Sequence, residues 1–171
     1  MVRLKKMLGD INSKECQDLM RLIETQSKET LANWAIDYAY EKYFPIYNIN
    51  DNTDELIKIC KEAINDKSKL PEAKSAIKQM RQNAKELTNE PINLATIKAI
   101  STACATIQTP SNAFGFLLYG SAAIAYFKLG LKDSQENYDN LASNELKEAL
   151  ASLQKRAILN ESKPVKIKWN C

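Results

Sequence analysis

Two carboxylates one helical turn apart are the residues in this sequence whose spacing could carry chemistry. Asp37 and Glu41 occur in LANWAIDYAYEKYFPIY, residues 31–47, with Trp34 and Tyr38 beside them. Such a pair could serve as general acid and base, could bind a metal, or could present negative charge to a basic partner. It could equally be a solvated face whose carboxylates pair with nearby lysine and arginine side chains.

Trp34 and Tyr38 themselves allow two interpretations. Large aromatic side chains most often fill a core, but they also anchor protein interfaces. The apolar residues of segment 28–44 cover most of the circumference of a helix, so this helix should be buried or should carry a contact surface. An exposed apolar area on it would make a homodimer an option.

A second group of polar residues surrounds the break QTPSN. These residues are neutral hydrogen-bonding types, and buried polar groups require partners. We expect them to cap helix ends, with Thr109 or Ser111 serving a helix that starts at Pro110. A ligand or partner site is the alternative. The group consists of Thr102, Thr106, Gln108, Thr109, Ser111 and Asn112.

Histidine is absent from the chain, which removes the Ser-His-Asp and Cys-His catalytic arrangements and the HExxH zinc site. Cys16, Cys60, Cys104 and Cys171 are far apart and form no CxxC pair, so reduced thiols are expected. Carboxylate or thiolate chemistry would need a cluster that the sequence does not display. We therefore predict no catalytic residue, no metal site and no cofactor.

Helices with recognisable boundary residues must position these side chains. With 44% hydrophobic and 26% charged residues, and only four Gly and five Pro, the 171-residue chain is typical of one helical domain rather than an all-β one. We predict an all-α, single-domain bundle of about seven helices over residues 1–171. Their expected starts are Ser13, Ser27, Asp51 or Thr53, Pro71, Pro91, Pro110, and Asp133 or Ser134.

The middle of this predicted bundle has no charge between residues 99 and 127. Its uninterrupted apolar run extends only from Ala113 to Phe127, which is shorter than the roughly 18 to 20 residues that a membrane span needs. Small residues such as Gly120 would let neighbouring backbones approach closely. The span therefore predicts a central uncharged helical hairpin, not a membrane segment.

The net charge of +3 is concentrated at the C-terminal end. No helix shows a run of Lys and Arg unmatched by acids, so the tail is expected to be the only basic segment, and nucleic-acid binding is not expected. Residues 159–171 should form a basic extended tail that packs as a strap or is partly mobile. The N-terminus lacks the apolar stretch of a secretory signal, which favours a cytoplasmic location, in a bacterium.

Two segments resemble a known family. The segment 31–47 resembles the acidic tryptophan-containing helix, and AISTACATIQTPSNAFGFLLYGSAAIAY, residues 99–126, resembles the small-residue hairpin, of an all-helical family of immunity proteins from bacterial polymorphic toxin systems. The likeness covers roughly residues 28–158. Trp34, Asp37, Glu41 and Pro45 are the matching positions of the first segment.

The hairpin departs from that family at positions where its members often carry histidine. These positions are Thr102, Gln108 and Asn112 here, so a metal or interface role of those histidines would be altered or absent in this chain.

The resemblance implies a non-enzymatic protein that neutralises a cognate bacterial toxin domain by direct stoichiometric binding. The partner-binding residues that we predict are Trp34, Asp37, Tyr38, Glu41, Gln108 and Asn112. The alternative is a helical protein that binds a metal through carboxylates, or a small ligand.

Overall fold

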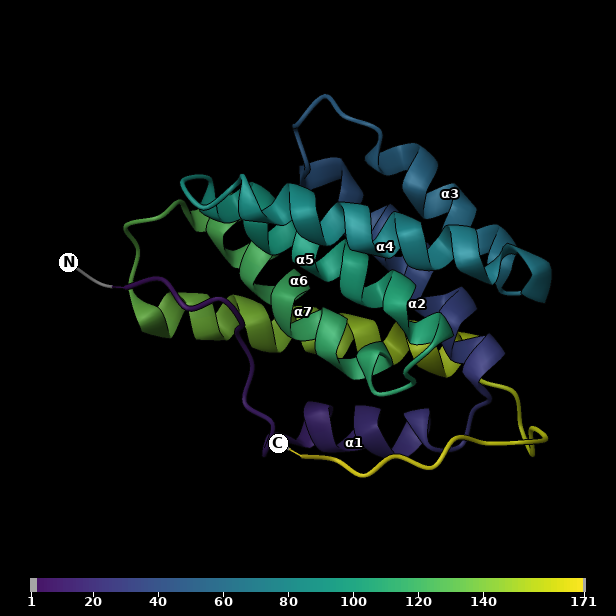
Figure 1. The fold of residues 1–171 in the computed structure, drawn as a ribbon. Helices are drawn as coiled ribbons and strands as arrows, with labels where there is room; N and C mark the ends of the chain where they lie inside the picture. Colours follow the sequence, from purple (N-terminus) through teal and green to yellow (C-terminus); the bar gives the residue numbers. More distant parts are fainter. Residues whose placement is uncertain (1–2, 171) are drawn as a thin grey trace.

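The structure, a computed structural model, describes residues 3–170, and seven α-helices lie within that range (Figure 1). The all-α bundle expected from the sequence is confirmed. The helices are α1 (Lys14–Ile23), α2 (Lys28–Lys42), α3 (Thr53–Ala63), α4 (Leu70–Lys85), α5 (Pro91–Cys104), α6 (Asn112–Leu129) and α7 (Gln135–Arg156). Single turns of 3₁₀ helix are η1 (Phe44–Ile46), η2 (Lys67–Lys69) and η3 (Ala105–Ile107).

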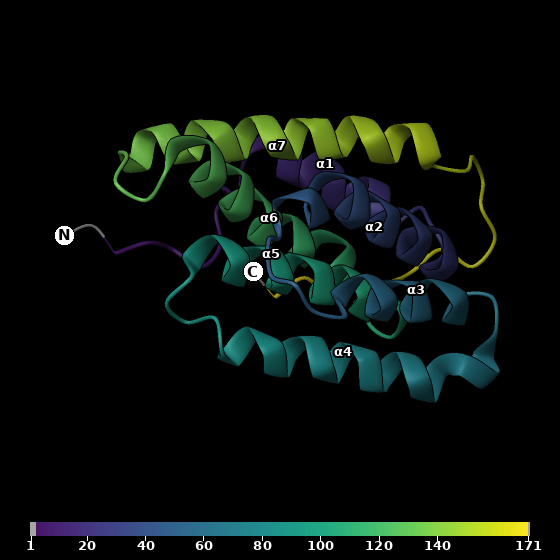
Figure 2. The same cartoon turned by 90° about the horizontal axis from the view of Figure 1, so that it is seen from above.

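The hairpin of α5 and α6 lies at the centre of the bundle. Figure 2 shows α7 and α4 at opposite faces of the molecule, with α6 and α5 between them. Helix α6 packs on α5 and α7, and α5 packs on α2 and α4. The predicted uncharged hairpin is therefore the core, although α6 begins at Asn112 rather than at Pro110. Within residues 3–170, no helix has both the length and the apolar character that a membrane crossing requires.

Helix α2 is buried on most of its surface. It contacts α3, α5, α6 and α7, and its apolar side chains from Leu31 to Ala39 are in the core. Tyr40, 39% exposed, is the large hydrophobic side chain that this helix leaves accessible. Of the two interpretations of α2, burial is the one that the structure shows. The exposed apolar face that suggested a homodimer is not present on this helix.

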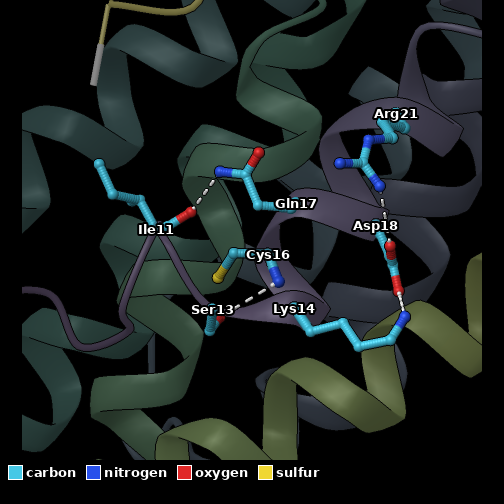
Figure 3. A network of polar contacts seen from close by, with 7 residues as sticks. All are labelled: Ile11, Ser13, Lys14, Cys16, Gln17, Asp18 and Arg21. Atoms are coloured by element: carbon cyan, nitrogen blue, oxygen red, sulfur yellow. Dashed lines mark hydrogen bonds and ion pairs between the residues drawn. The ribbon is translucent and has the colours of Figure 1, made fainter.

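Serine side chains start three of the helices. Figure 3 shows the example at α1, where Ser13 Oγ accepts a hydrogen bond of 3.3 Å from the backbone N–H of Cys16. The Gln17 side-chain amide donates to the Ile11 carbonyl at 2.7 Å and so fixes the chain that enters the helix. Such caps satisfy N–H groups that have no partner within the helix. The same role belongs to Ser27 at α2 and Ser134 at α7.

The C-terminal tail, residues 157–170, is an extended strap that runs beside α1 (Figure 1). The buried Gln26 side chain accepts a hydrogen bond from Ile158 N at 2.8 Å and donates to the Ile158 carbonyl at 3.1 Å. The Val165 N–H donates to the Gln26 carbonyl at 2.9 Å. Further along, the Trp169 ring meets Phe114 edge to face at 5.9 Å. These contacts join the strap to the turn after α1 and to α6.

A close contact in the core joins the end of α2 to α6. Tyr43 follows α2, is fully buried, and lies with its ring against Gly120. A Cβ placed at Gly120 would be 2.0 Å from Tyr43 Cζ, which no pair of unbonded carbon atoms tolerates. The absence of a side chain at Gly120 is therefore what allows the two helices to meet.

We predict that Gly120→Ala destabilises the protein strongly. The added methyl group must displace the Tyr43 ring and its hydroxyl, which is hydrogen-bonded to Glu145, so the free energy of unfolding should fall by about 3 kcal/mol. Gly115→Ala is the matched control in the same helix, because its Cβ would be 3.8 Å from its nearest neighbour, Thr102 Cγ2.

Urea denaturation of both variants measures this difference. Gly115→Ala should equal the wild type or gain up to about 1 kcal/mol from better helix propensity. Equal stability of the two alanine variants would contradict the close contact.

Candidate functional site

The two aromatic residues predicted to bind a partner lie in the core. Trp34 is 1% and Tyr38 is 6% exposed. The Trp34 indole N–H donates to Ser152 Oγ at 3.1 Å, and both rings meet Phe116 edge to face. Any effect of Trp34 and Tyr38 on a partner is therefore indirect, through the shape of the bundle that they hold.

Asp37 and Glu41 lie one helical turn apart on α2, but their side chains have different surroundings. Asp37 is bridged to Lys61 at 2.7 Å and to Arg156 at 3.1 Å, so its charge is used inside the molecule. Glu41 is exposed and belongs to none of the ion pairs within residues 3–170. For Asp37 the structure shows pairing with nearby lysine and arginine. A role of either carboxylate in binding stays a prediction.

Gln108 and Asn112 lie at the corner between η3 and α6. Gln108 is exposed and Asn112 is half-buried. The expectation that Ser111 caps α6 through its side chain is wrong, because backbone carbonyls do this work: Ser111 O accepts from both Phe114 N and Gly115 N. Thr106 of the same polar group is fully buried, so only part of the group is accessible. Partner binding by Gln108 and Asn112 stays a prediction.

The most unusual polar group in the molecule is Glu145 of α7, which the sequence analysis did not single out. Its side chain is almost completely buried. The hydroxyls of Tyr38 and Tyr43 both donate to Glu145 Oε2, at 2.9 and 2.6 Å. Lys42 Nζ lies 3.4 Å from Glu145 Oε1 and 2.5 Å from Oε2 of Glu148, which is closer to the solvent. A carboxylate thus ties α2 and the turn after it to α7.

The electrostatics of this cluster follow from its burial. Loss of water raises the pKa of Glu145, and the hydrogen bond from Tyr43 and the charge of Lys42 offset part of that effect. Burial, followed by the charge of Glu145, raises the pKa of Tyr43, so its hydroxyl keeps its proton and remains a donor. The lone pairs of Glu145 are occupied by neighbours from its own fold. The cluster therefore acts as a structural anchor.

Glu145 has a sequence signature that could have revealed it. It occupies a position on α7 that is in phase with Tyr138, Ala142, Ala149 and Leu153, all of which are buried. An acidic residue within an apolar stripe at helical spacing indicates a buried carboxylate with donors nearby. The donors themselves come from α2, which the sequence of α7 does not show.

Burial also limits the reactivity of the cysteine thiols. Cys60 and Cys104 are buried and are free thiols, and a hydrogen bond with Cys60 together with burial raises the pKa of the Cys104 thiol well above its usual value. Cys16 is also buried, and Cys171 lies outside the described residues. Within residues 3–170, no group of three or more His, Cys, Asp or Glu is arranged to hold a metal ion.

Two of the hollows on the surface differ in electrostatic character. One, of about 470 Å³, is lined by both signs of charge, including Lys5, Glu15 and Asp139. The other, of about 460 Å³, lies between the N-terminal segment, α4 and α5, and its charged lining is entirely basic. The expectation that the tail is the only basic segment is therefore wrong, because folding gathers cations from three segments here.

A comparison with known protein families finds a match over most of the bundle. Residues 21–154, most of the bundle, match the family model described as "Imm-5 like putative immunity protein". The chain belongs to this family of immunity proteins. No curated protein and no solved structure matches the chain. The family region begins inside α1 and ends in α7, so it contains the hairpin and the Glu145 cluster, while the N-terminal segment and the strap lie outside it.

We predict that Glu145 gives the protein a stability that falls as the pH rises. Its pKa is higher in the folded than in the unfolded chain, so between these two values the folded state binds more protons. The free energy of unfolding should decrease across that interval by at most about 1.4 kcal/mol per pH unit, and Glu145→Gln should remove this contribution. Denaturation of wild type and variant at a series of pH values from the usual glutamate pKa upward gives the difference.

Glu148→Gln is the matched control on the same helix. A hydrogen bond from Lys42 lowers the pKa of Glu148, so its contribution is present above the unfolded-state pKa and is lost as the pH falls through the folded-state value. The two variants should therefore change the pH dependence with opposite signs. If both substitutions changed the pH dependence of stability with the same sign, burial would not raise the pKa of Glu145.

Proposed function

We propose that this protein is an immunity protein that neutralises a cognate bacterial toxin by binding to it directly, in a one-to-one complex. The observation that carries the proposal is the match of residues 21–154 to the family of immunity proteins. The partner implied is a toxin domain of a polymorphic toxin system, and the place of action is the cytoplasm of the bacterium that must be protected.

The internal chemistry of the bundle supports binding over catalysis. The buried carboxylate of Glu145 is occupied by Tyr38, Tyr43 and Lys42, and the Cys104 thiol is held in its protonated form. Both groups serve the packing of the core. What such a body offers a partner is a preformed surface, and preformed surfaces bind with little loss of conformational freedom. We therefore propose a non-enzymatic mechanism, in which the toxin is blocked by occupation of its surface.

A titration of toxin activity separates this mechanism from catalytic inactivation. The cognate toxin domain is purified, and its activity is measured while the immunity protein is added. Direct binding predicts that inhibition rises in proportion to the protein added and is complete at an equimolar amount, with a complex that elutes as one species in size-exclusion chromatography. Complete inhibition at a small fraction of one equivalent would show an enzyme and would overturn the proposal.

A further inference from the structure

The basic hollow is a groove formed by three segments that are distant in the sequence. Lys6 comes from the N-terminal segment, Arg81 and Lys85 come from α4, and Lys98 comes from α5. Leu94 belongs to the lining of this groove and of the smaller hollow that adjoins it, where Leu4, Ala95 and Pro91 add apolar surface. The groove thus combines positive walls with an apolar floor.

The cations of the groove have no acidic partner of their own. Among the described residues, the ion pairs of 4.0 Å or less use other lysines and arginines, such as Lys58 with Asp54 and Lys61 with Asp37. Lys6, Arg81, Lys85 and Lys98 are in none of them. A group of like charges with no acidic side chain within 4.0 Å among the described residues attracts negative charge.

The charged form of Lys98 is disfavoured in this groove. Its ammonium lies over the ring of Tyr119, 5.8 Å from the centroid, and its side chain is half-buried. Burial lowers the pKa of Lys98, and the positive charge of Lys6 lowers it further. A carboxylate that entered the groove would offset both effects, because it would solvate the ammonium and neutralise the repulsion. The ammonium groups of Lys6 and Lys98 would therefore be stabilised by a bound anion.

The groove is also fixed in shape. The Tyr126 hydroxyl donates to the carbonyl of Lys5 at 2.6 Å, and the N–H of Leu8 donates to the carbonyl of Leu118 at 3.1 Å. These two hydrogen bonds hold the N-terminal segment against α6 on both sides of Lys6. A partner would not have to order this wall on binding, which favours affinity.

Helix α4 extends the positive surface beyond the groove. Lys74, Lys78, Arg81 and Lys85 recur at intervals that place them on one side of the helix, and all four are exposed. Glu72 is the acidic residue of this helix. A partner segment lying along α4 would therefore meet basic side chains over most of the length of the helix.

We propose that this groove, with the basic side of α4, is the surface on which the protein docks an acidic segment of its cognate toxin. The inference rests on the proposed function and specifies its contact face. Charge complementarity favours a carboxylate-bearing protein segment, and the apolar floor suits aliphatic side chains between the carboxylates. Nucleic acid fits less well, because among the described residues no aromatic side chain lines the groove and Tyr126, in the adjoining hollow, is buried, so no ring is offered there for a base to stack on.

The test compares two variants that change the net charge equally. Lys6→Glu/Arg81→Glu/Lys85→Glu reverses exposed cations of the groove, whereas Lys155→Glu/Lys166→Glu/Lys168→Glu reverses exposed cations at the C-terminal end of the chain. All six side chains are on the surface, so both variants should fold, which circular dichroism and thermal unfolding verify. The probes are poly-L-glutamate and, as the competing class, single-stranded oligo-dT, each titrated at several salt concentrations.

We expect poly-L-glutamate to bind the wild type and to bind more weakly as salt rises, because salt screens exposed charges. The groove variant should lose about tenfold or more in affinity, while the C-terminal variant should stay within about twofold of the wild type. Equal affinity of both variants, or no binding by the wild type, would overturn the proposal. Tighter binding of oligo-dT than of poly-L-glutamate at the same groove would overturn the proposal and indicate that the groove binds nucleic acid.

A second measurement uses the toxin domain in the inhibition titration described above. The groove variant should need a several-fold excess to inhibit the toxin, whereas the C-terminal variant should still reach its endpoint at an equimolar amount. If the groove variant inhibits as well as the wild type, the toxin docks elsewhere and this inference fails while the proposed function stands. If the wild type itself does not inhibit, the proposed function fails, and the poly-L-glutamate result then decides separately whether the groove binds acidic chains.

Discussion

The contact between Tyr43 and Gly120, fastened by Glu145, is the constraint on which the rest of the structure depends. It joins α2 to α6 by steric fit and to α7 by hydrogen bonds. A buried carboxylate is costly unless its oxygens are bound, and here Tyr38, Tyr43 and Lys42 bind them. A shift of any one of the three helices would break at least one of these contacts. The relative position of the helices is therefore defined by chemistry as well as by burial.

This fixed core decides which charges remain for a partner. Asp37 is drawn into ion pairs with Lys61 and Arg156, so much of the negative charge that marks α2 in the sequence is spent within the fold. The opposite holds at the groove, where Lys6 and Lys98 line one hollow and the charge of Lys6 lowers the pKa of Lys98. The unpaired charge at the groove is thus positive, whereas the sequence pointed to the acidic residues Asp37 and Glu41 of α2.

The helices were predictable because their signals are local. Ser13, Ser27 and Ser134 cap helices within three residues of themselves, and Pro91 starts α5. The site was not predictable in the same way. The apolar residues of α2 cover most of its circumference, so periodicity could not say whether Trp34 and Tyr38 are buried. The donors to Glu145 lie more than 100 residues away in the chain. The groove likewise exists only after three separated segments meet.

The position of the groove relative to the family region bears on how one fold could serve different toxins. Arg81, Lys85 and Lys98 lie within residues 21–154, which match the family, whereas Lys6 lies before them. Discrimination between partners requires surfaces that differ while the core that holds them stays the same. The N-terminal wall is attached to α6 through its own main-chain groups, the Lys5 carbonyl and the Leu8 N–H, so these hydrogen bonds do not depend on the identity of residue 6. The charge at that position can therefore change without disturbing the contact between Tyr43 and Gly120. Stability and specificity are thereby carried by different parts of the molecule.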